Sequence, residues 1–240
     1  MIGKKRVLAI VPARGGSKGI PLKNLRPVGG VPMVARVGHL VRGITMIDRT
    51  VVSTDHEEIA RVAEESGLAA PFRRPVELFG DCIGDIGVLT HALNEMEGID
   101  SAVYDIVVML QPTSPLRRPE DVVHTIEKLV QGDWDAVWTV SVTDPKNHPL
   151  KQLVLTDGTE KLNYYDPAGA AVVARQQMAP LYHRNGVAYA FTRACLLEQK
   201  SIMGTRSAAL ILEDTHVSID TPSDLDWVEF ILSRRPDAPK

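Results

Sequence analysis

The chain has 240 residues, of which 44% are hydrophobic, 24% charged and 5% aromatic, which is an ordinary globular composition. Its length lies between one and two typical domains. The net charge of −3, from 27 Lys and Arg against 30 Asp and Glu, excludes a protein held to nucleic acid by bulk positive charge. The apolar runs fall short of the roughly 20 residues of a membrane span. Two cysteines, Cys82 and Cys195, favour the cytoplasm over a disulfide framework.

Short apolar runs alternate with segments of helical periodicity along most of the chain. We expect strands at 7–12, 50–54, 105–110, 136–142, 187–191 and 208–212. We expect helices at 32–42, 55–66, 86–96, 119–130 and 221–233, and a further helix starting at 192. This alternation predicts an α/β fold with a doubly wound, mostly parallel sheet, in which 105–110 is a central strand.

Two of the expected helices carry capping signals. Asp55 followed by Glu58 has the pattern of a capping box, which gives Asp55 a structural role. Thr221 as cap, followed by Pro222 and Asp224, predicts the start of the last helix.

The alternation stops between 144 and 185. This stretch contains Pro145, Pro149, Pro167 and Pro180 and a few short β-like pieces, and it is too long for a simple loop in a compact domain. The sequence therefore predicts one domain from 1–143 and 186–240, with an inserted subdomain at 144–185.

Four irregular segments are expected to lie at the carboxyl ends of strands, at 13–24, 74–85, 111–117 and 218–220. Ligands of open α/β sheets bind beyond the carboxyl ends of the strands, so these segments are expected to converge. The first is rich in Gly, Lys and Arg, which suit phosphate binding, although a flexible basic loop is the alternative. It matches neither the Gly-Lys-Ser/Thr triphosphate loop nor the Gly-x-Gly-x-x-Gly dinucleotide motif.

The run Ala-Arg-Gly-Gly-Ser-Lys-Gly-Ile-Pro-Leu-Lys-Asn at 13–24 resembles the signature of the acylneuraminate cytidylyltransferases, the CMP–sialic acid synthetases. Further motifs of that family follow in order: Ser53-Thr54-Asp55, Arg74-Pro75-x-Glu77-Leu78, Leu110-Gln111-Pro112-Thr113-Ser114-Pro115-Leu116-Arg117, His148-Pro149-Leu150-Lys151, Arg175-Gln176-Gln177, Asn185-Gly186 and Ile219-Asp220-Thr221. The resemblance extends from Val7 to about Leu232.

This resemblance implies a Rossmann-like fold and a CTP-dependent nucleotidyltransferase. The enzyme would transfer CMP to the anomeric hydroxyl of a nine-carbon 2-keto sugar acid, of the sialic or legionaminic type, and release pyrophosphate. It would use Mg²⁺ or Mn²⁺. The segment 144–185 would be a dimerisation arm that completes the active site of the partner in a homodimer. No nucleic acid or membrane is expected as a partner.

The resemblance also implies roles for individual residues. Those expected at the nucleotide are Ala13, Arg14, Gly15, Gly16, Ser17, Lys18, Lys23, Asn24, Arg74 and Asp85. Those expected at the sugar acid are Gln111, Thr113, Ser114, Lys151, Arg175, Gln176 and Asn185. Arg14, Lys18 and Asp220 would be catalytic, and Asp220 would bind the metal.

Arg74 matches the arginine with which the family reads the base. A guanidinium can donate to N3 and O2 of cytosine, whereas uracil has an N–H at N3, so the wrong base would leave a buried donor unpaired. Without the motif, the position of Arg74 favours an ordinary surface arginine. Gln111 is likewise compatible with a plain turn, and Asp220 with an acidic residue serving the next helix dipole.

Two positions depart from the family pattern. Ser218-Ile219-Asp220 stands where the family reads Asp-Ile-Asp, and Asp85 stands where a serine is expected. Glu213 or Asp214 could replace the missing carboxylate, or one metal could suffice. These departures leave the identity of the sugar acid open. The alternatives are an enzyme for an eight-carbon 3-deoxy-octulosonate-type acid, and an inactive nucleotide-binding homologue, which Ser218 favours.

Overall fold

The computed structural model describes residues 1–78, 80 and 83–234. Within them lies a six-stranded sheet of order β10-β6-β9-β5-β1-β4. Its strands are β1 (Val7–Pro12), β4 (Arg49–Ser53), β5 (Ile106–Met109), β6 (Ala136–Val142), β9 (Tyr182–Thr192) and β10 (Ser207–Ile211). Strand β9 runs antiparallel to β5 and β6, and the other neighbours pair in parallel. The expected mostly parallel sheet with an interior strand β5 is therefore confirmed.

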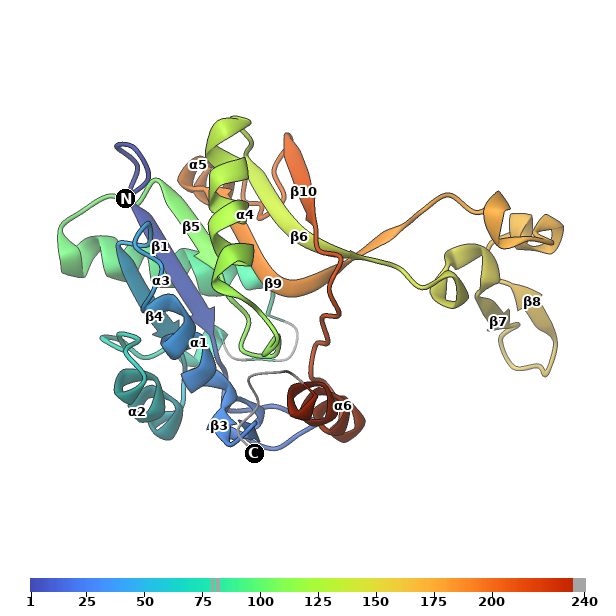
Figure 1. Cartoon of the computed structure of the whole chain (residues 1–240), viewed down its shortest axis with the longest axis horizontal. Helices are drawn as coiled ribbons and strands as arrows, with labels where there is room; N and C mark the ends of the chain where they lie inside the picture. The colour runs from blue at the N-terminus through green and yellow to red at the C-terminus, as the bar shows by residue number, and fades with distance from the viewer. Residues whose placement is uncertain (79, 81–82, 235–240) are drawn as a thin grey trace.

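Helices cover both faces of this sheet (Figure 1). One face carries α1 (Met33–Val41), α2 (Glu57–Glu65) and α4 (Pro119–Gln131), and the other carries α3 (Asp85–Asp100) and α5 (Arg193–Leu197).

Strand β1 shows why the sequence reads as continuous apolar runs. Val7, Ala9 and Val11 pack with the helices of the first face, while Leu8 and Ile10 pack with those of the second. All five side chains are fully buried. A strand covered on both faces has no polar alternation, and the doubly wound arrangement is confirmed.

The last helix, α6 (Pro222–Ser233), lies below the sheet beside the small antiparallel pair β2 (Pro27–Val28) and β3 (Val31–Pro32). Thr221 caps it as expected, with its hydroxyl accepting from the backbone N–H of Asp224. A separate apolar cluster that includes Ile20, Leu116 and Ile219 joins this helix to three of the irregular segments.

The predicted cap of α2 is wrong. The cap is His56, whose Nδ1 accepts from the backbone N–H of Glu58 at 3.2 Å. Asp55 instead accepts a hydrogen bond from the backbone N–H of Gly15 at 2.9 Å. Asp55 therefore anchors the first irregular loop, a long-range contact that local spacing cannot reveal.

Residues 143–181 leave the sheet between β6 and β9 and extend away from the body as an arm (Figure 1). The arm contains the hairpin of β7 (Leu153–Leu155) and β8 (Leu162–Tyr164), together with short 3-10 turns. Strand β9 begins at Tyr182 rather than at the expected Val187, because its first residues still pair with the end of β6. Asn185 is thus part of the sheet.

Residues 218–220, the irregular segment before the last helix, form no strand, although Ile219 donates from its backbone N–H to the carbonyl of Thr113 at 2.9 Å. In the described part of the chain, no helix combines the length and the apolar character needed to cross a membrane.

Candidate active site

A cavity of about 620 Å³ opens at the edge of the sheet where β1, β4 and β5 end. All four irregular segments contribute to its lining, and the start of β9 closes one side. The predicted convergence is therefore confirmed. The lining residues are Pro12, Arg14, Ser17, Lys18, Gly19, Lys23, Asn24, Arg74, Leu78, Gly80, Ile83, Asp85, Val88, Gln111, Pro112, Thr113, Arg184, Asn185, Gly186, Tyr189, Ser218 and Asp220.

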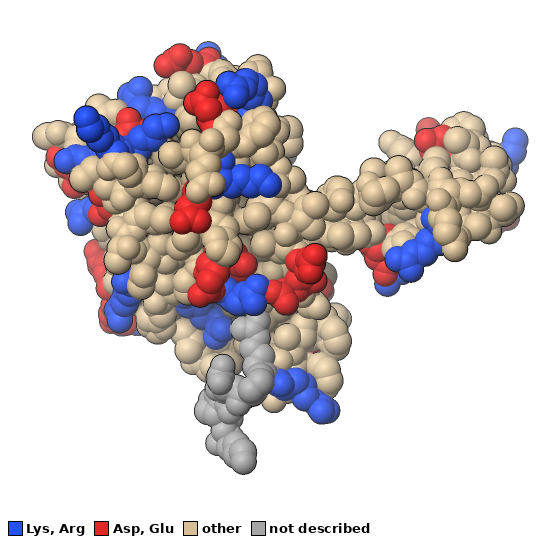
Figure 2. All heavy atoms as spheres, turned by 45° about the horizontal axis from the view of Figure 1, so that its top comes forward, with Lys and Arg blue, Asp and Glu red and all other residues tan. Residues whose placement is uncertain are grey.

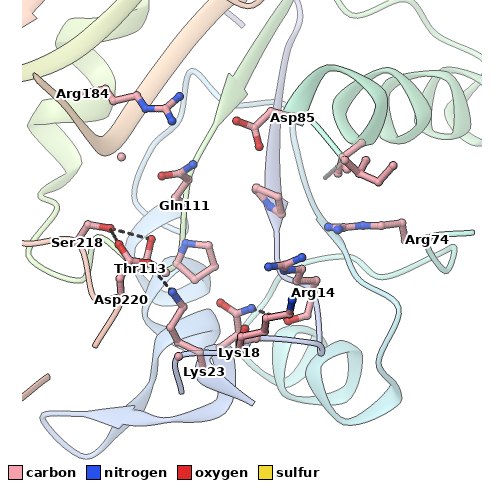
Figure 3. A pocket seen from close by; sticks show the side chains of 18 of the residues that line it. Arg14, Lys18, Lys23, Arg74, Asp85, Gln111, Thr113, Arg184, Ser218 and Asp220 are labelled. Carbon is pink, nitrogen blue, oxygen red and sulfur yellow. Dashed lines mark hydrogen bonds and ion pairs between the residues drawn. The ribbon is translucent and has the colours of Figure 1, made fainter. Parts of the chain in front are cut away.

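The backbone of the first loop is fixed by contacts on the side away from the cavity, and its basic side chains face the cavity (Figure 3). Asn24 is buried and donates from Nδ2 to the carbonyl of Arg14 at 2.9 Å. Gly19 lies against the backbone of Asp220, where a Cβ would approach the carbonyl oxygen to 2.5 Å, so only glycine fits this contact. The positions of Arg14, Lys18 and Lys23 are thus set by fixed backbone.

Three residues that the resemblance assigned to the nucleotide do not line the cavity. Ala13 is fully buried, and its N–H donates to the carbonyl of Ser53 at 3.0 Å. Gly15 is tied to Asp55, and Gly16 is exposed beside it. Cys82 lies outside the described residues, and Cys195 is a buried free thiol.

Arg74 is buried, with 6% of its surface exposed, yet its guanidinium reaches the cavity. Its Nε donates to the hydroxyl of Ser53 at 3.2 Å and its Nη2 to the Ser53 carbonyl at 2.6 Å. Burial lowers the pKa of Arg74, partly offset by the charges of Asp55 and Asp85. Nη1 makes no hydrogen bond to any described residue, so it is available to a ligand in the cavity.

The opposite wall is formed by Gln111 and Thr113, supported by a buried polar network. Ser114, expected at the sugar acid, is buried and donates from Oγ to the carbonyl of Asn185 at 2.8 Å. The amide of Asn185 is also engaged, since Oδ1 accepts from Thr139 Oγ1 at 2.7 Å and Nδ2 donates to Ser141 Oγ at 3.1 Å. Ser114 and Asn185 therefore support the wall within the protein.

Arg117 connects the segments that form this wall through hydrogen bonds, a role that the sequence did not indicate. Its guanidinium donates to the carbonyls of Gln111 at 2.6 Å, Gly186 at 3.0 Å and Val187. Burial lowers its pKa to about 10, so the charge is retained at neutral pH. Arg117 joins the end of β5 to the start of β9.

Asp220 stands at the rim of the cavity, with 69% of its side chain exposed. Its Oδ1 pairs with Lys23 Nζ at 2.7 Å, and Ser218 donates to its Oδ2 at 3.4 Å. Neither alternative carboxylate lines the cavity: Asp214 pairs with Arg118, and Glu213 is exposed. In the part of the chain that the structure describes, no three His, Cys, Asp or Glu residues gather as a metal site.

Lys151, Arg175 and Gln176 are exposed on the arm and do not line the cavity of their own chain. Arg184 and Tyr189 line the cavity but had no predicted role. Both belong to β9, whose direction brings its amino-terminal half to the edge where parallel strands have their carboxyl ends. Nothing in the local sequence indicates that direction.

Comparison with known proteins gives the family. The sequence model described as Cytidylyltransferase matches residues 8–232. The chain is 30% identical to a CMP-N,N'-diacetyllegionaminic acid synthase of Legionella pneumophila, covering 92% of this chain and 93% of the relative. It is 28% identical to a pseudaminic acid cytidylyltransferase of Campylobacter jejuni, covering 93% and 95%.

A solved structure shares the fold. It is a CMP:2-keto-3-deoxy-manno-octonic acid synthetase complexed with CTP, with a TM-score of 0.71 and 19% sequence identity, covering 96% of this chain and 99% of that one. With the family match across nearly the whole sequence, the conclusion is that this chain is a member of the cytidylyltransferase family, which are CTP-dependent nucleotidyltransferases.

Proposed function

We propose that the protein transfers CMP from CTP to the anomeric hydroxyl of a nine-carbon 2-keto sugar acid. The observation that carries the proposal is the cavity, which joins a rigid basic loop to a buried base-facing arginine and to a polar wall across from both. Two relatives are named for nine-carbon acids, legionaminic and pseudaminic acid, which favours that class over an eight-carbon acid.

In the proposed reaction, the anomeric oxygen attacks the α-phosphorus of CTP. A new C–O–P link forms, the bond from the α-phosphorus to the bridging oxygen breaks, pyrophosphate leaves, and the hydroxyl proton passes to solvent. Phosphoryl transfer depends mainly on positioning and charge neutralisation. Arg14, Lys18 and Lys23 supply positive charge along one side of the cavity, where the triphosphate would lie.

The residues present fit one magnesium ion. Mg²⁺ is commonly held by one or two carboxylates together with substrate phosphates and water, and Asp220 offers one exposed carboxylate at the cavity rim. The bound ion would neutralise charge on the phosphate oxygens. Lys23 occupies Oδ1 of Asp220 at 2.7 Å, so this lysine would turn to the phosphates as the carboxylate takes up its ligand. Mn²⁺ suits the same oxygen donors.

The arm supports the proposed homodimer. Its hairpin exposes Leu153, Leu155 and Leu162 by more than half, and Lys151 and Arg175 lie on the same arm, outside their own cavity. A second copy would cover the apolar side chains and receive the basic ones in its own active site. The free thiol of Cys195 agrees with the proposed cytoplasmic location.

The proposed function is tested by pyrophosphate release with CTP, Mg²⁺ and a panel of eight- and nine-carbon 2-keto sugar acids. We expect turnover with a nine-carbon acid and little with an eight-carbon one. Absence of pyrophosphate with every acid and Mg²⁺ concentration, despite CTP binding, would support the inactive homologue. Equal turnover with both classes would remove the nine-carbon assignment.

Base selection is tested separately by thermal denaturation. A ligand at 100 times its dissociation constant adds about 2.7 kcal/mol to stability, so CTP should raise the melting temperature more than UTP at the same concentration. Arg74→Lys should bring the two shifts together. Equal shifts in the wild-type protein would contradict base reading by Arg74.

A further inference from the structure

Arg184 is a cavity cation that the proposed triphosphate site does not use. The described lining contains five Lys and Arg residues. Arg14, Lys18 and Lys23 come from the first loop, and Arg74 comes from the segment after α2. Arg184 comes from β9 and lies on the far side of the cavity from Lys18 and Lys23, near Gln111 and Asp85 in Figure 3.

The backbone around Arg184 is held by strand pairing and by contacts of the neighbouring Gly186. It pairs with Val140 of β6, next to a register shift in that strand pair. Two residues on, Gly186 adopts a φ of +72°, and a Cβ there would approach Gln111 Oε1 to 2.6 Å. The Gly186 carbonyl is held by Arg117 at 3.0 Å. The backbone that carries Arg184 is therefore held against the Gln111 wall, and its side chain extends into the cavity on that side (Figure 3).

Arg184 has different electrostatic neighbours from Lys23. Burial raises the pKa of Tyr189, the charge of Arg184 lowers it and that of Asp85 raises it, so these three side chains are electrostatic neighbours. Asp85 also acts on Arg74, whereas Lys23 acts on Asp220 and Asp224. Arg184 makes no ion pair or hydrogen bond through its side chain with the described residues, and it is exposed to the cavity.

An unpaired guanidinium in a binding cavity is suited to a carboxylate, which it can bind through two parallel hydrogen bonds. The proposed reaction brings two anionic groups into this cavity, the triphosphate of CTP and the carboxylate of the sugar acid. The first loop serves the triphosphate. Asn185, the residue of this strand expected at the sugar, has its amide engaged by Thr139 and Ser141. Its neighbour Arg184 has free donors.

We propose that Arg184 binds the carboxylate of the sugar acid and determines specificity for acids over neutral sugars. Gln111 would position the same end of the sugar. This inference rests on the proposed function. It assigns the carboxylate to a residue of the chain that holds the nucleotide, so that Lys151 and Arg175 of the arm are not its principal ligands.

The test uses Arg184→Gln and Arg184→Lys in the full-length protein, with Arg206→Gln as a matched control. Arg206 is an exposed arginine that pairs with Asp133 outside the cavity. Because a charge-assisted bidentate contact is lost, KM for the sugar acid should rise about 10- to 100-fold in Arg184→Gln and less in Arg184→Lys, with KM for CTP within about twofold. Arg206→Gln should leave both constants unchanged.

A substrate change isolates the carboxylate. Wild-type protein should favour the acid over its C1-amide by about 10- to 100-fold, and Arg184→Gln should remove most of that preference. Calorimetric titration of the acid, in the presence of a non-hydrolysable CTP analogue, reads binding without turnover. The CTP-induced rise in melting temperature shows whether each variant is folded and binds nucleotide.

The outcomes separate the two proposals. If wild-type protein neither binds nor converts any sugar acid, the proposed function fails and this inference fails with it. If wild-type protein converts an acid and Arg184→Gln keeps the same acid-to-amide preference, the inference alone is overturned. An unchanged KM for the acid in Arg184→Gln would overturn it equally.

Discussion

The cavity and the arm differ in how their side chains are satisfied. In the cavity wall, buried polar groups such as Arg117 and Asn185 find hydrogen-bond partners within the chain. In the arm, apolar side chains of the β7–β8 hairpin point into solvent, and the arm surface seen in Figure 2 is mostly uncharged. One region is completed by its own fold, and the other presents a surface that its own chain does not cover.

This difference distinguishes the residues of the cavity from the residues of the arm. An isolated two-stranded hairpin is marginally stable, and burying apolar surface contributes roughly 25 cal/mol per Å². In the proposed dimer, a second copy would therefore stabilise mainly the arm, because the cavity wall is already packed within one chain. Substitutions in the cavity should act within one chain, and substitutions in the arm should act on the neighbouring chain.

The largest effect is expected for Arg14→Ala. The side chain faces the cavity from a loop held by Asn24 and Asp55, so its loss should lower kcat/KM by about 10³-fold or more without unfolding the protein. Steady-state pyrophosphate release and circular dichroism measure the two properties. The control is Arg26→Ala, an exposed arginine of the same loop that bonds to the Pro21 carbonyl. Loss of folding in Arg14→Ala would make Arg14 structural.

Mixing two inactive variants tests whether the arm acts in trans. Arg14→Ala damages the cavity, and a Lys151→Ala, Arg175→Ala double variant damages the arm. If chains exchange at random, half of the dimers are mixed and each has one intact site, which restores about a quarter of the wild-type activity. Activity is measured before and after exchange of equimolar chains. A mixture no more active than the sum of its components would place the arm's role within its own chain.

A smaller effect is expected where Asp55 anchors the loop. Asp55→Ala removes the acceptor of the Gly15 N–H, which should loosen the loop and weaken CTP binding about tenfold, with a loss of roughly 1 kcal/mol in stability. Asp144→Ala is the matched change in the arm, where the carboxylate accepts from the Lys146 N–H. Calorimetry with CTP should show no change for that control. Equal losses in both variants would contradict a specific anchor at Asp55.

The smallest effect on activity is expected for Glu97→Gln, which touches neither region. Glu97 accepts from Arg193 Nε at 2.9 Å and Nη2 at 3.0 Å and from the Tyr104 N–H at 3.0 Å. Burial raises the pKa of Glu97, but these hydrogen bonds and the charge of Arg193 lower it overall, below its ordinary value of 4.5. Because the folded-state pKa is the lower one, the stabilisation is present above pH 4.5 and disappears as the pH falls through the folded value.

Glu97→Gln should therefore lose about 1–2 kcal/mol at pH 7, and the difference from wild type should shrink below about pH 4. Urea denaturation at pH 7, 5 and 3.5 measures this, with activity at pH 7 unchanged. Glu95→Gln, an exposed carboxylate that lies 3.8 Å from His91, serves as control and should change the free energy of unfolding at pH 7 by much less than Glu97→Gln. A constant difference across the range would mean that packing, not charge, is lost.

Much of the fold followed from local patterns. The apolar runs located the strands, because strands covered on both faces consist mainly of apolar residues, as Val7 to Val11 do. The cap at Thr221 followed from the residue types next to it. The predicted cap at Asp55 was wrong. Asp55 accepts a hydrogen bond from the distant backbone N–H of Gly15, and the neighbouring His56 caps the helix instead.

The candidate site was likewise predictable in part from the sequence. The sequence by itself determined that Gly, Lys and Arg would follow the first strand, and that irregular segments would gather where parallel strands end. Only the tertiary structure decided that β9 is antiparallel, and so placed Arg184 and Tyr189 in the cavity. The physical reason is that the side chains of a strand alternate with a period of two in either direction. Periodicity reports burial, whereas direction depends on the neighbours with which the strand pairs.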